Sequence, residues 1–286
     1  MAADTLTAIL FPGQGSQTTG MAAVTAAQRP DLLAQASGEL GADPFRRIGE
    51  STRFAQPAIY CASLAHWKQA GSPAGDMVAG HSLGELAALV AGGALGAEEG
   101  LRLAVIRGRL MDEAAEANPG AMLAVLGGDG PVRELAERLD LAVANDNAPG
   151  QVVLSGKTEA VAAARKALRA DGVRAIRLPV AGAFHSPLME DAATRFREVL
   201  EVVELGSPER PVYSSTAAAP FADVRAGLAA ALTEPVAWAE TLRQMRDGGA
   251  GNFLETGPGE VLTGLVRRTL PEVAARSLAE PEVVHG

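Results

Sequence analysis

The sequence predicts an α/β protein in which a small two-layer module is inserted into a larger domain. Short apolar runs end at glycine-rich turns that lead into helices, which is the order of elements in α/β folds. Between residues 120 and 180 the order changes to strand, helix, strand, strand, helix, strand, which is typical of a ferredoxin-like unit. A chain of 286 residues can bury a core for such a host and its insert.

The first part of the host alternates strands with helices. Leu6–Phe11 is an apolar run that stops at a glycine-rich turn, and Met77–Ala79 is a brief strand that runs directly into another. Helices are expected at Gln56–Ala70, from Glu85 onward, and at Leu101–Ala117. The residues Asn118-Pro119-Gly120 end helices, so we place a domain boundary there.

The insert is expected to be a small ferredoxin-like subdomain at residues 120–188. Its strands are predicted at 121–126, 141–145, 151–155 and 173–178, and its helices at 132–139 and 159–170. The chain then returns to the host, with helices near 189–203, 226–232 and 237–247 and from 261, and strands at 212–215 and 252–255. Residues 1–119 and 189–286 therefore form the large domain.

Charge and composition exclude several classes of protein. The 34 acidic residues outnumber the 25 basic ones, giving a net charge of −9, which argues against a nucleic-acid surface. The single cysteine, Cys61, cannot form an internal disulfide or a multi-cysteine zinc site. No apolar stretch reaches the roughly 18 residues of a membrane span, and the first residues lack a signal-peptide pattern. We expect a cytoplasmic protein that binds neither nucleic acid nor membrane and holds no metal.

The pattern Gly80-x-Ser82-x-Gly84 lies between a predicted strand and a predicted helix. It matches a nucleophile elbow, in which glycines let the chain turn sharply and raise the serine hydroxyl into a cleft. Free amides at the start of the following helix can also stabilise an oxyanion. The alternative interpretation is an ordinary turn in which Ser82 only caps the helix.

A serine nucleophile needs a base, and the chain has four histidines. His66 lies within a helix, the side chain of His81 is expected to point away from the neighbouring serine, and His285 is one residue from the chain end. His185 remains, in a loop after the last strand of the insert, where a side chain can reach a cleft between the domains. A lone loop histidine is usually solvent-exposed, and the elbow serine is the reason to prefer a base.

Arg107 falls on the apolar side of its helix, between Leu103 and Met111 on a helical wheel. A guanidinium there is costly without an anionic partner, and its planar fork suits a carboxylate. That carboxylate can belong to a ligand or to an internal glutamate or aspartate. The side chain can also extend to the rim of the core.

Two glycine-rich segments, 12–17 and 255–259, each follow a strand and precede a helix. Neither has the spacing of a phosphate-binding loop, so nucleotide binding is not predicted. Both are placed to line a cleft at the carboxyl ends of the strands.

Five motifs, in this order, resemble the malonyl-CoA:acyl carrier protein transacylases, of the stand-alone bacterial type that serves fatty-acid synthesis. They are Phe11-Pro12-Gly13-Gln14-Gly15-Ser16-Gln17, Gly80-His81-Ser82-Leu83-Gly84-Glu85, Arg107-Gly108-Arg109-Leu110-Met111, Gly182-Ala183-Phe184-His185-Ser186-Pro187 and Glu255-Thr256-Gly257-Pro258-Gly259. The resemblance spans nearly the whole chain. It implies an α/β-hydrolase-like host domain with an inserted ferredoxin-like subdomain.

The resemblance also implies roles for individual residues. Ser82 is expected to become malonylated and His185 to act as the general base. Arg107 is expected to bind the malonyl carboxylate, with Met111 beside it. The Leu83 amide and Gln14 are expected to form the oxyanion hole.

Two further positions follow from the same resemblance. Relatives often have a glutamine whose backbone carbonyl orients the histidine, and the aligned position here is Gly248. Phe184, directly before His185, resembles the residue in malonyl-selective members rather than the small residue of methylmalonyl-selective ones.

The implied reaction is ping-pong transfer of malonyl from malonyl-CoA to the phosphopantetheine thiol of acyl carrier protein, by a monomer that needs no cofactor. Alternatives are an acyltransferase of a polyketide or malonate decarboxylase system, a serine thioesterase or hydrolase, and a docking module without activity. Because carrier proteins are acidic, we expect a local basic patch at the cleft mouth, with Arg267 and Arg268 as candidates.

Overall fold

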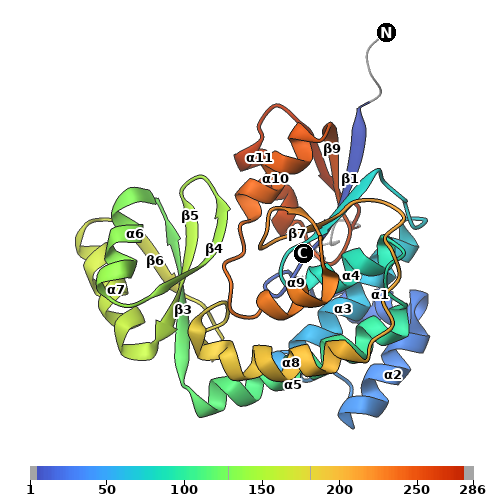
Figure 1. Cartoon of the computed structure of the whole chain (residues 1–286), viewed down its shortest axis with the longest axis horizontal. Coiled ribbons are helices and arrows are strands. Elements are labelled where there is room, and N and C mark those ends of the chain that lie inside the picture. The colour runs from blue at the N-terminus through green and yellow to red at the C-terminus, as the bar shows by residue number, and fades with distance from the viewer. Residues whose placement is uncertain (1–4, 128, 181, 280–286) are drawn as a thin grey trace, which may run out of the picture.

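The computed structural model describes residues 5–127, 129–180 and 182–279. Within these ranges the strands form a six-stranded and a four-stranded sheet. Figure 1 shows the smaller sheet, with α6 and α7, as a lobe on one side of the molecule, and the larger sheet with the other helices on the opposite side. The fold is an α/β-hydrolase-like core with an inserted ferredoxin-like subdomain, so the predicted fold class is confirmed.

The chain forms the predicted strands and helices together with further elements that were not predicted. The helices are α1 (Met21–Gln28), α2 (Pro30–Leu40), α3 (Thr52–Gln69), α4 (Gly84–Ala91), α5 (Ala97–Ala117), α6 (Asp129–Arg138), α7 (Thr158–Ala170), the 3₁₀ turn η1 (Pro187–Met189), α8 (Glu190–Glu201), α9 (Val224–Ala230), α10 (Trp238–Asp247) and α11 (Val261–Thr269). The strands are β1 (Leu6–Phe11), β2 (Met77–Gly80), β3 (Gly120–Leu126), β4 (Ala142–Ala148), β5 (Gln151–Lys157), β6 (Arg174–Arg177), β7 (Val212–Ser214), β8 (Ala219–Pro220), β9 (Ala250–Glu255) and β10 (Ala274–Ser277).

The large sheet has the strand order β10-β9-β1-β2-β7-β8, and all its neighbouring strands are parallel except β7 and β8. The last four residues of β1, 8–11, are fully buried. The chain passes from β1 to β2 on one side, whereas β9, late in the sequence, pairs on the other. This reversal places the loops after β1, β2 and β9 at one edge of the sheet, where open α/β sheets bind ligands.

The small sheet has the antiparallel order β4-β5-β3-β6, which is the ferredoxin-like arrangement. Alternation along β3 gives the sheet two faces. Ala121, Leu123 and Val125 form a core with α6 and α7, whereas Met122 packs into the core of the large domain. The small subdomain therefore turns its second face toward the large domain.

Backbone hydrogen bonds join the two parts. The Asp146 amide of β4 donates to the Val236 carbonyl at 2.8 Å, and the Val236 amide donates to the Ala144 carbonyl at 2.8 Å. Val236 lies in the connection between α9 and α10, so β4 fixes a loop of the large domain. The boundaries at 119/120 and 188/189 stay a prediction.

The sequence reasoning missed α1, α2, β8 and β10. Helices α1 and α2 bury few large side chains, since their buried residues are Met21, Thr25, Leu32, Ala36 and Leu40. β8 has two exposed residues, and β10 is stabilised by pairing with β9 rather than by an apolar face of its own. Elements of this kind leave little hydrophobic periodicity to detect.

Phe253 in β9 tests the packing of the large sheet. It is 1% exposed, and truncation of a buried phenylalanine removes apolar contacts and leaves a cavity. We expect Phe253→Ala to lower the free energy of unfolding by about 3–5 kcal/mol, measured by urea denaturation. Val261→Ala, at a position 47% exposed, is the control and should change it by less than about 0.5 kcal/mol. Equal losses in both variants would contradict the assigned core.

Candidate active site

Ser82 lies in a sharp turn between β2 and α4. Its backbone has φ 52°, in the left-handed region that costs a non-glycine residue about 1–2 kcal/mol. The two flanking glycines make the turn possible. A Cβ on Gly80 would lie 1.9 Å from the carbonyl carbon of Gly84, and a Cβ on Gly84 would lie 2.1 Å from the carbonyl oxygen of Phe11. The predicted elbow geometry is present, and it raises the Ser82 hydroxyl into a cavity.

His185 lies directly beside this hydroxyl. Its Nε2 is 2.9 Å from the Oγ of Ser82, and its Nδ1 is 3.2 Å from the carbonyl oxygen of Glu234. A carbonyl only accepts, so Nδ1 carries the proton and Nε2 is free to accept from Ser82. His185 is buried and also has a left-handed backbone, with φ 56°. The structure thus brings the predicted nucleophile and base together, each on a strained residue, as is common at functional sites.

The prediction that Gly248 orients the histidine is wrong. Gly248 follows the last turn of α10, where its amide donates to the Gln244 carbonyl. The carbonyl that accepts from His185 belongs to Glu234, in the loop between α9 and α10. A backbone carbonyl can come from any residue type, so the sequence alone carried no signal that distinguished the two positions.

Arg107 contacts the same serine. Its Nη2 donates to Ser82 Oγ at 3.1 Å and its Nη1 donates to Gln56 Oε1 at 2.8 Å. The side chain is 4% exposed, so it does not extend to the rim, and it forms no ion pair with a carboxylate of the described residues. Burial lowers the pKa of Arg107 to about 10, which leaves it charged at neutral pH. The charge of Glu85 opposes the effect of burial on this pKa, but Glu85 forms no ion pair with Arg107, and the binding of a ligand carboxylate stays a prediction.

Gln56 is a site residue that the sequence reasoning missed. It lies on α3, is 1% exposed, and holds Arg107 through its carbonyl oxygen. Its amide group donates to Thr52 Oγ1 at 2.9 Å and to the sulfur of Met111 at 3.2 Å. These bonds fix the direction of the Gln56 amide and hence of the guanidinium. No local signal pointed to Gln56, because its partner Arg107 lies 51 residues away in the sequence.

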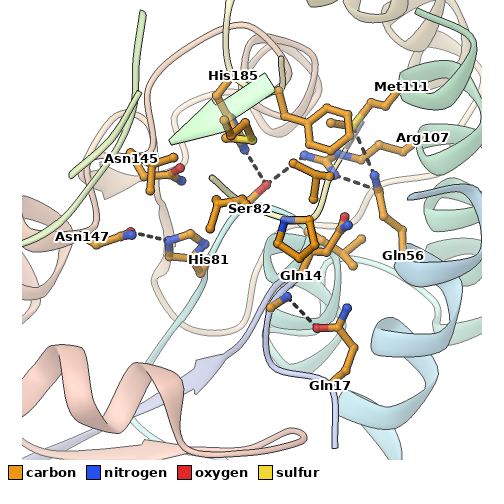
Figure 2. A pocket seen from close by; sticks show the side chains of 18 residues that line it. Gln14, Gln17, Gln56, His81, Ser82, Arg107, Met111, Asn145, Asn147 and His185 are labelled. Atoms are coloured by element: carbon orange, nitrogen blue, oxygen red, sulfur yellow. Dashed lines mark hydrogen bonds between the residues drawn. The ribbon is translucent and has the colours of Figure 1, made fainter. Parts of the chain in front are cut away.

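Ser82, His185 and Arg107 line a cavity of about 480 Å³, shown in Figure 2 with Ser82 between the other two. Met111 and Phe184 form part of its apolar wall, and Gln14 and Leu83 also line it. All four are residues that the sequence analysis assigns to the site. The Leu83 amide follows Ser82 at the start of α4 and makes no hydrogen bond to another described residue.

Strand β4 of the small subdomain contributes two polar side chains to the cavity wall. Asn145 and Asn147 of β4 line it, and Asn147 Oδ1 lies 2.8 Å from Nε2 of His81. This contact turns the His81 ring away from Ser82, as expected from the turn (Figure 2). His66 is buried in α3 and does not line the cavity, and His285 lies outside the described residues.

Burial is the main cause of the unusual titration of His185. It lowers the pKa of His185 to about 3, and the charge of Arg107 and the nearby His81 ring add to the shift. The imidazole is therefore neutral over the whole range around pH 7.

The described residues contain no group of three or more His, Cys, Asp or Glu side chains suited to a metal ion. None of the helices that the structure describes is long and apolar enough to cross a membrane.

Comparison with known proteins gives one family. The family model described as "Acyl transferase domain" matches residues 42–284. The malonyl CoA-acyl carrier protein transacylase of Escherichia coli strain K12 is 37% identical over 300 residues, covering 97% of this chain and 97% of that protein. The polyketide biosynthesis protein ThaF of Burkholderia thailandensis is 40% identical over 290 residues, but this chain, covered at 94%, spans only 25% of ThaF.

Solved structures agree with this assignment. The malonyl-CoA:acyl carrier protein transacylase of Xanthomonas oryzae pv. oryzae is 36% identical with a TM-score of 0.89, covering 98% of this chain and 96% of that one. A malonyl-transacylase solved in complex with a type II PKS acyl-carrier protein is 37% identical with a TM-score of 0.86, covering 96% of each chain.

Gly84→Ala tests the close approach at the elbow. The added Cβ overlaps the Phe11 carbonyl, and the backbone of the turn must move. We expect a fall of about 2 kcal/mol or more in the free energy of unfolding and loss of Ser82 reactivity, measured by denaturation and by labelling with a fluorophosphonate probe. Gly264→Ala is the matched control, because it lies in α11 with open space around the new methyl group and should be neutral or stabilising. A fully reactive Gly84→Ala protein would contradict the need for glycine.

The lowered pKa of His185 predicts a pH-dependent stability. Between the unfolded pKa of 6.5 and the folded pKa of about 3, the unfolded chain binds a proton at this residue that the folded chain does not. The free energy of unfolding therefore falls as the pH drops below the unfolded-state pKa of His185. Relative to His185→Gln, which cannot titrate, the free energy of unfolding of the wild-type protein should fall by about 1.7 kcal/mol between pH 6.5 and pH 5. Urea titrations at both pH values measure this, and parallel curves for the two proteins would refute the low pKa.

Proposed function

We propose that this chain, which belongs to the acyl transferase domain family, transfers malonyl from malonyl-CoA to the phosphopantetheine thiol of acyl carrier protein. The observation that carries the proposal is the buried Arg107, whose Nη2 lies 3.1 Å from the Ser82 hydroxyl and which has no ion-pair partner among the described side chains. An acyl group attached to Ser82 and ending in a carboxylate one methylene away supplies the missing anion. Acyl groups without a carboxylate leave the guanidinium unpaired, which is unfavourable.

In the first half-reaction, Ser82 Oγ attacks the thioester carbonyl and its proton passes to Nε2 of His185. The tetrahedral oxyanion accepts hydrogen bonds from the Leu83 amide and from Gln14. Its collapse breaks the carbon–sulfur bond, and the proton on His185 passes to the leaving thiolate of coenzyme A. The product is malonyl-Ser82 with its carboxylate on Arg107.

In the second half-reaction, the carrier's thiol donates its proton to His185 and attacks the ester carbonyl. The same oxyanion hole holds the charge, and the proton returns to Ser82 as the carbon–oxygen bond breaks. Met111 and Phe184 limit the space beside the malonyl methylene, which favours malonyl over branched acyl groups. No metal or organic cofactor takes part in either step.

The acidic carrier is expected to dock at the mouth of the cavity, where Arg267 and Arg268 remain candidates. Both lie at the end of α11, and Arg268 Nη1 donates to Gln151 Oε1 of the small subdomain at 2.8 Å. Arg267 Nη2 donates to the carbonyl of Ala275 in β10 at 3.1 Å, so this side chain lies against that strand. We propose that the enzyme acts as a monomer in the cytoplasm.

We propose that the enzyme serves fatty-acid synthesis. Polyketide assembly is the second candidate pathway. The second candidate is favoured by the 40% identity to ThaF, which is named as a polyketide biosynthesis protein. Both use the same chemistry at Ser82. Transfer rates to purified carrier proteins of the two pathways distinguish them.

Acylation without carrier tests the proposed reaction. Incubation with malonyl-CoA should give a stable malonyl adduct on Ser82 by intact mass spectrometry, and acetyl-CoA should give little. Ser82→Ala should abolish the adduct. Arg107→Ala should lower kcat/KM for malonyl-CoA by about a hundredfold or more, because it removes the charge-assisted hydrogen bonds to the carboxylate.

The controls separate the rival activities. Arg109→Ala, on the exposed side of the same helix, should leave the rate within about twofold. Steady release of coenzyme A without an adduct would indicate a thioesterase instead, and the absence of both signals would indicate a docking module.

A further inference from the structure

A buried pair of side chains lies behind the nucleophile turn and has no part in the reaction described above. Glu85 is 1% exposed and Ser215 is fully buried. Oε1 of Glu85 accepts from the Ser215 amide at 2.7 Å and from the Ser215 hydroxyl at 2.9 Å. Glu85 is the second residue of α4, and Ser215 follows directly after β7. The pair therefore joins the elbow to the end of the neighbouring strand.

The hydroxyl of Ser215 continues the chain of hydrogen bonds to the nucleophile. Because it donates to Glu85, its lone pair faces the Ser82 amide, which donates to it at 3.4 Å. Ser82 has a left-handed backbone, a conformation that persists only where the surroundings hold it. The Ser215 hydroxyl thus contacts the backbone of this strained residue.

The backbone of Ser215 reaches the base from the other direction. Its carbonyl accepts from the Ala237 amide at 2.7 Å. Ala237 ends the short segment that begins with Glu234, whose carbonyl accepts from Nδ1 of His185. The same segment is fixed at Val236 by β4. A single residue is therefore bonded both to the turn that holds Ser82 and to the segment that orients His185.

We propose that Glu85 and Ser215 form a positioning unit that holds the Ser82 turn and the Glu234–Ala237 segment in register, so that Ser82 Oγ and His185 Nε2 stay within hydrogen-bond distance. Neither residue touches the reacting atoms. The inference rests on the proposed acyl transfer only for the choice of substrate, since the alignment of a serine with a histidine matters for any electrophile.

The unit works through hydrogen-bond acceptance rather than charge. One oxygen of Glu85, Oε1, takes both bonds from Ser215, whereas Oε2 is buried and meets the distance and angle criteria for a hydrogen bond with none of the described residues. Burial raises the pKa of Glu85 to about 7, so the neutral acid is readily populated. Glutamine retains an acceptor of the same shape, and leucine retains the volume but not the acceptor.

The test compares Ser215→Ala, Glu85→Leu and Glu85→Gln with the wild-type protein. Ser155→Ala is the matched control, because Ser155 is also fully buried but lies in β5, and its hydroxyl makes no hydrogen bond within the described residues. The first readout is the rate at which a fluorophosphonate labels Ser82, with loss of fluoride from phosphorus. This reaction needs the serine and the histidine but not malonyl-CoA. The second readout is kcat and KM for malonyl-CoA at saturating carrier.

Ser215→Ala and Glu85→Leu should each lower the labelling rate and kcat by about tenfold or more, with KM changed less than about twofold, because misplaced reacting groups slow the chemical step. Glu85→Gln should retain at least a third of the wild-type rate, and Ser155→Ala should match wild type. Rates are normalised to the folded fraction measured by circular dichroism. If Ser215→Ala does not fold, the difference in labelling rate between Glu85→Gln and Glu85→Leu tests the proposal instead.

Three outcomes overturn the inference. Labelling of Ser215→Ala as fast as that of Ser155→Ala removes the role of the hydroxyl. Equal losses in Glu85→Gln and Glu85→Leu assign the effect to charge, and a rise in KM alone assigns it to substrate binding. A wild-type protein that reacts with the fluorophosphonate but not with malonyl-CoA refutes the proposed function and leaves the positioning unit open to the same test.

Discussion

The proposed active site is organised around a buried guanidinium that forms no ion pair among the described residues, although the charge of Glu85 offsets part of the effect of burial. Arg107 replaces its hydration with the Gln56 carbonyl and the Ser82 hydroxyl, both neutral groups. Two neutral acceptors compensate only part of the lost solvation, as the lowered pKa shows. The unsatisfied remainder is what an anionic substrate can use. On the proposed function, we therefore expect selectivity for an acyl group with a second carboxylate to depend on the burial of one cation rather than on the shape of the pocket alone.

The same cation affects the base. Arg107 and burial together make the protonated form of His185 unfavourable, so the imidazole remains an acceptor even in mildly acidic solution. The proposed nucleophile and base lie 103 residues apart in the sequence, and on our proposal their contact depends on hydrogen bonds that run outside the cavity. Those bonds pass through Ser215, the loop that contains Glu234 and Val236, and strand β4 of the small subdomain. The insert is thus part of the framework that aligns the pair.

The sequence predicted the parts of the molecule that have strong local signals. The central strands, the long helices and the βαββαβ order follow from apolar periodicity and turn residues. Ser82 was predicted from its two flanking glycines, and the structure shows that backbone atoms occupy the space where a Cβ on either glycine would lie. His185 followed from elimination and Arg107 from its side of a helix. The sequence could not reveal Glu234, because its role belongs to a backbone carbonyl, or Gln56, because its partner is 51 residues away. Helices α1 and α2 were missed because their apolar faces are narrow.

A histidine oriented by a neutral carbonyl is a weaker base than one paired with a carboxylate, because a carbonyl stabilises the protonated ring less than a negative charge does. Such a base removes a proton more readily from a thiol, with an ordinary pKa near 8.5, than from water, with a pKa near 15.7. Ser82 needs less help than water, since its Oγ already contacts both Arg107 and His185. Water that enters after acylation must give its proton to the same weak base, and it is a poorer proton donor than a thiol. The acyl-enzyme is therefore expected to wait for the carrier thiol, and the low basicity of His185 is itself a reason why the geometry favours transfer over hydrolysis.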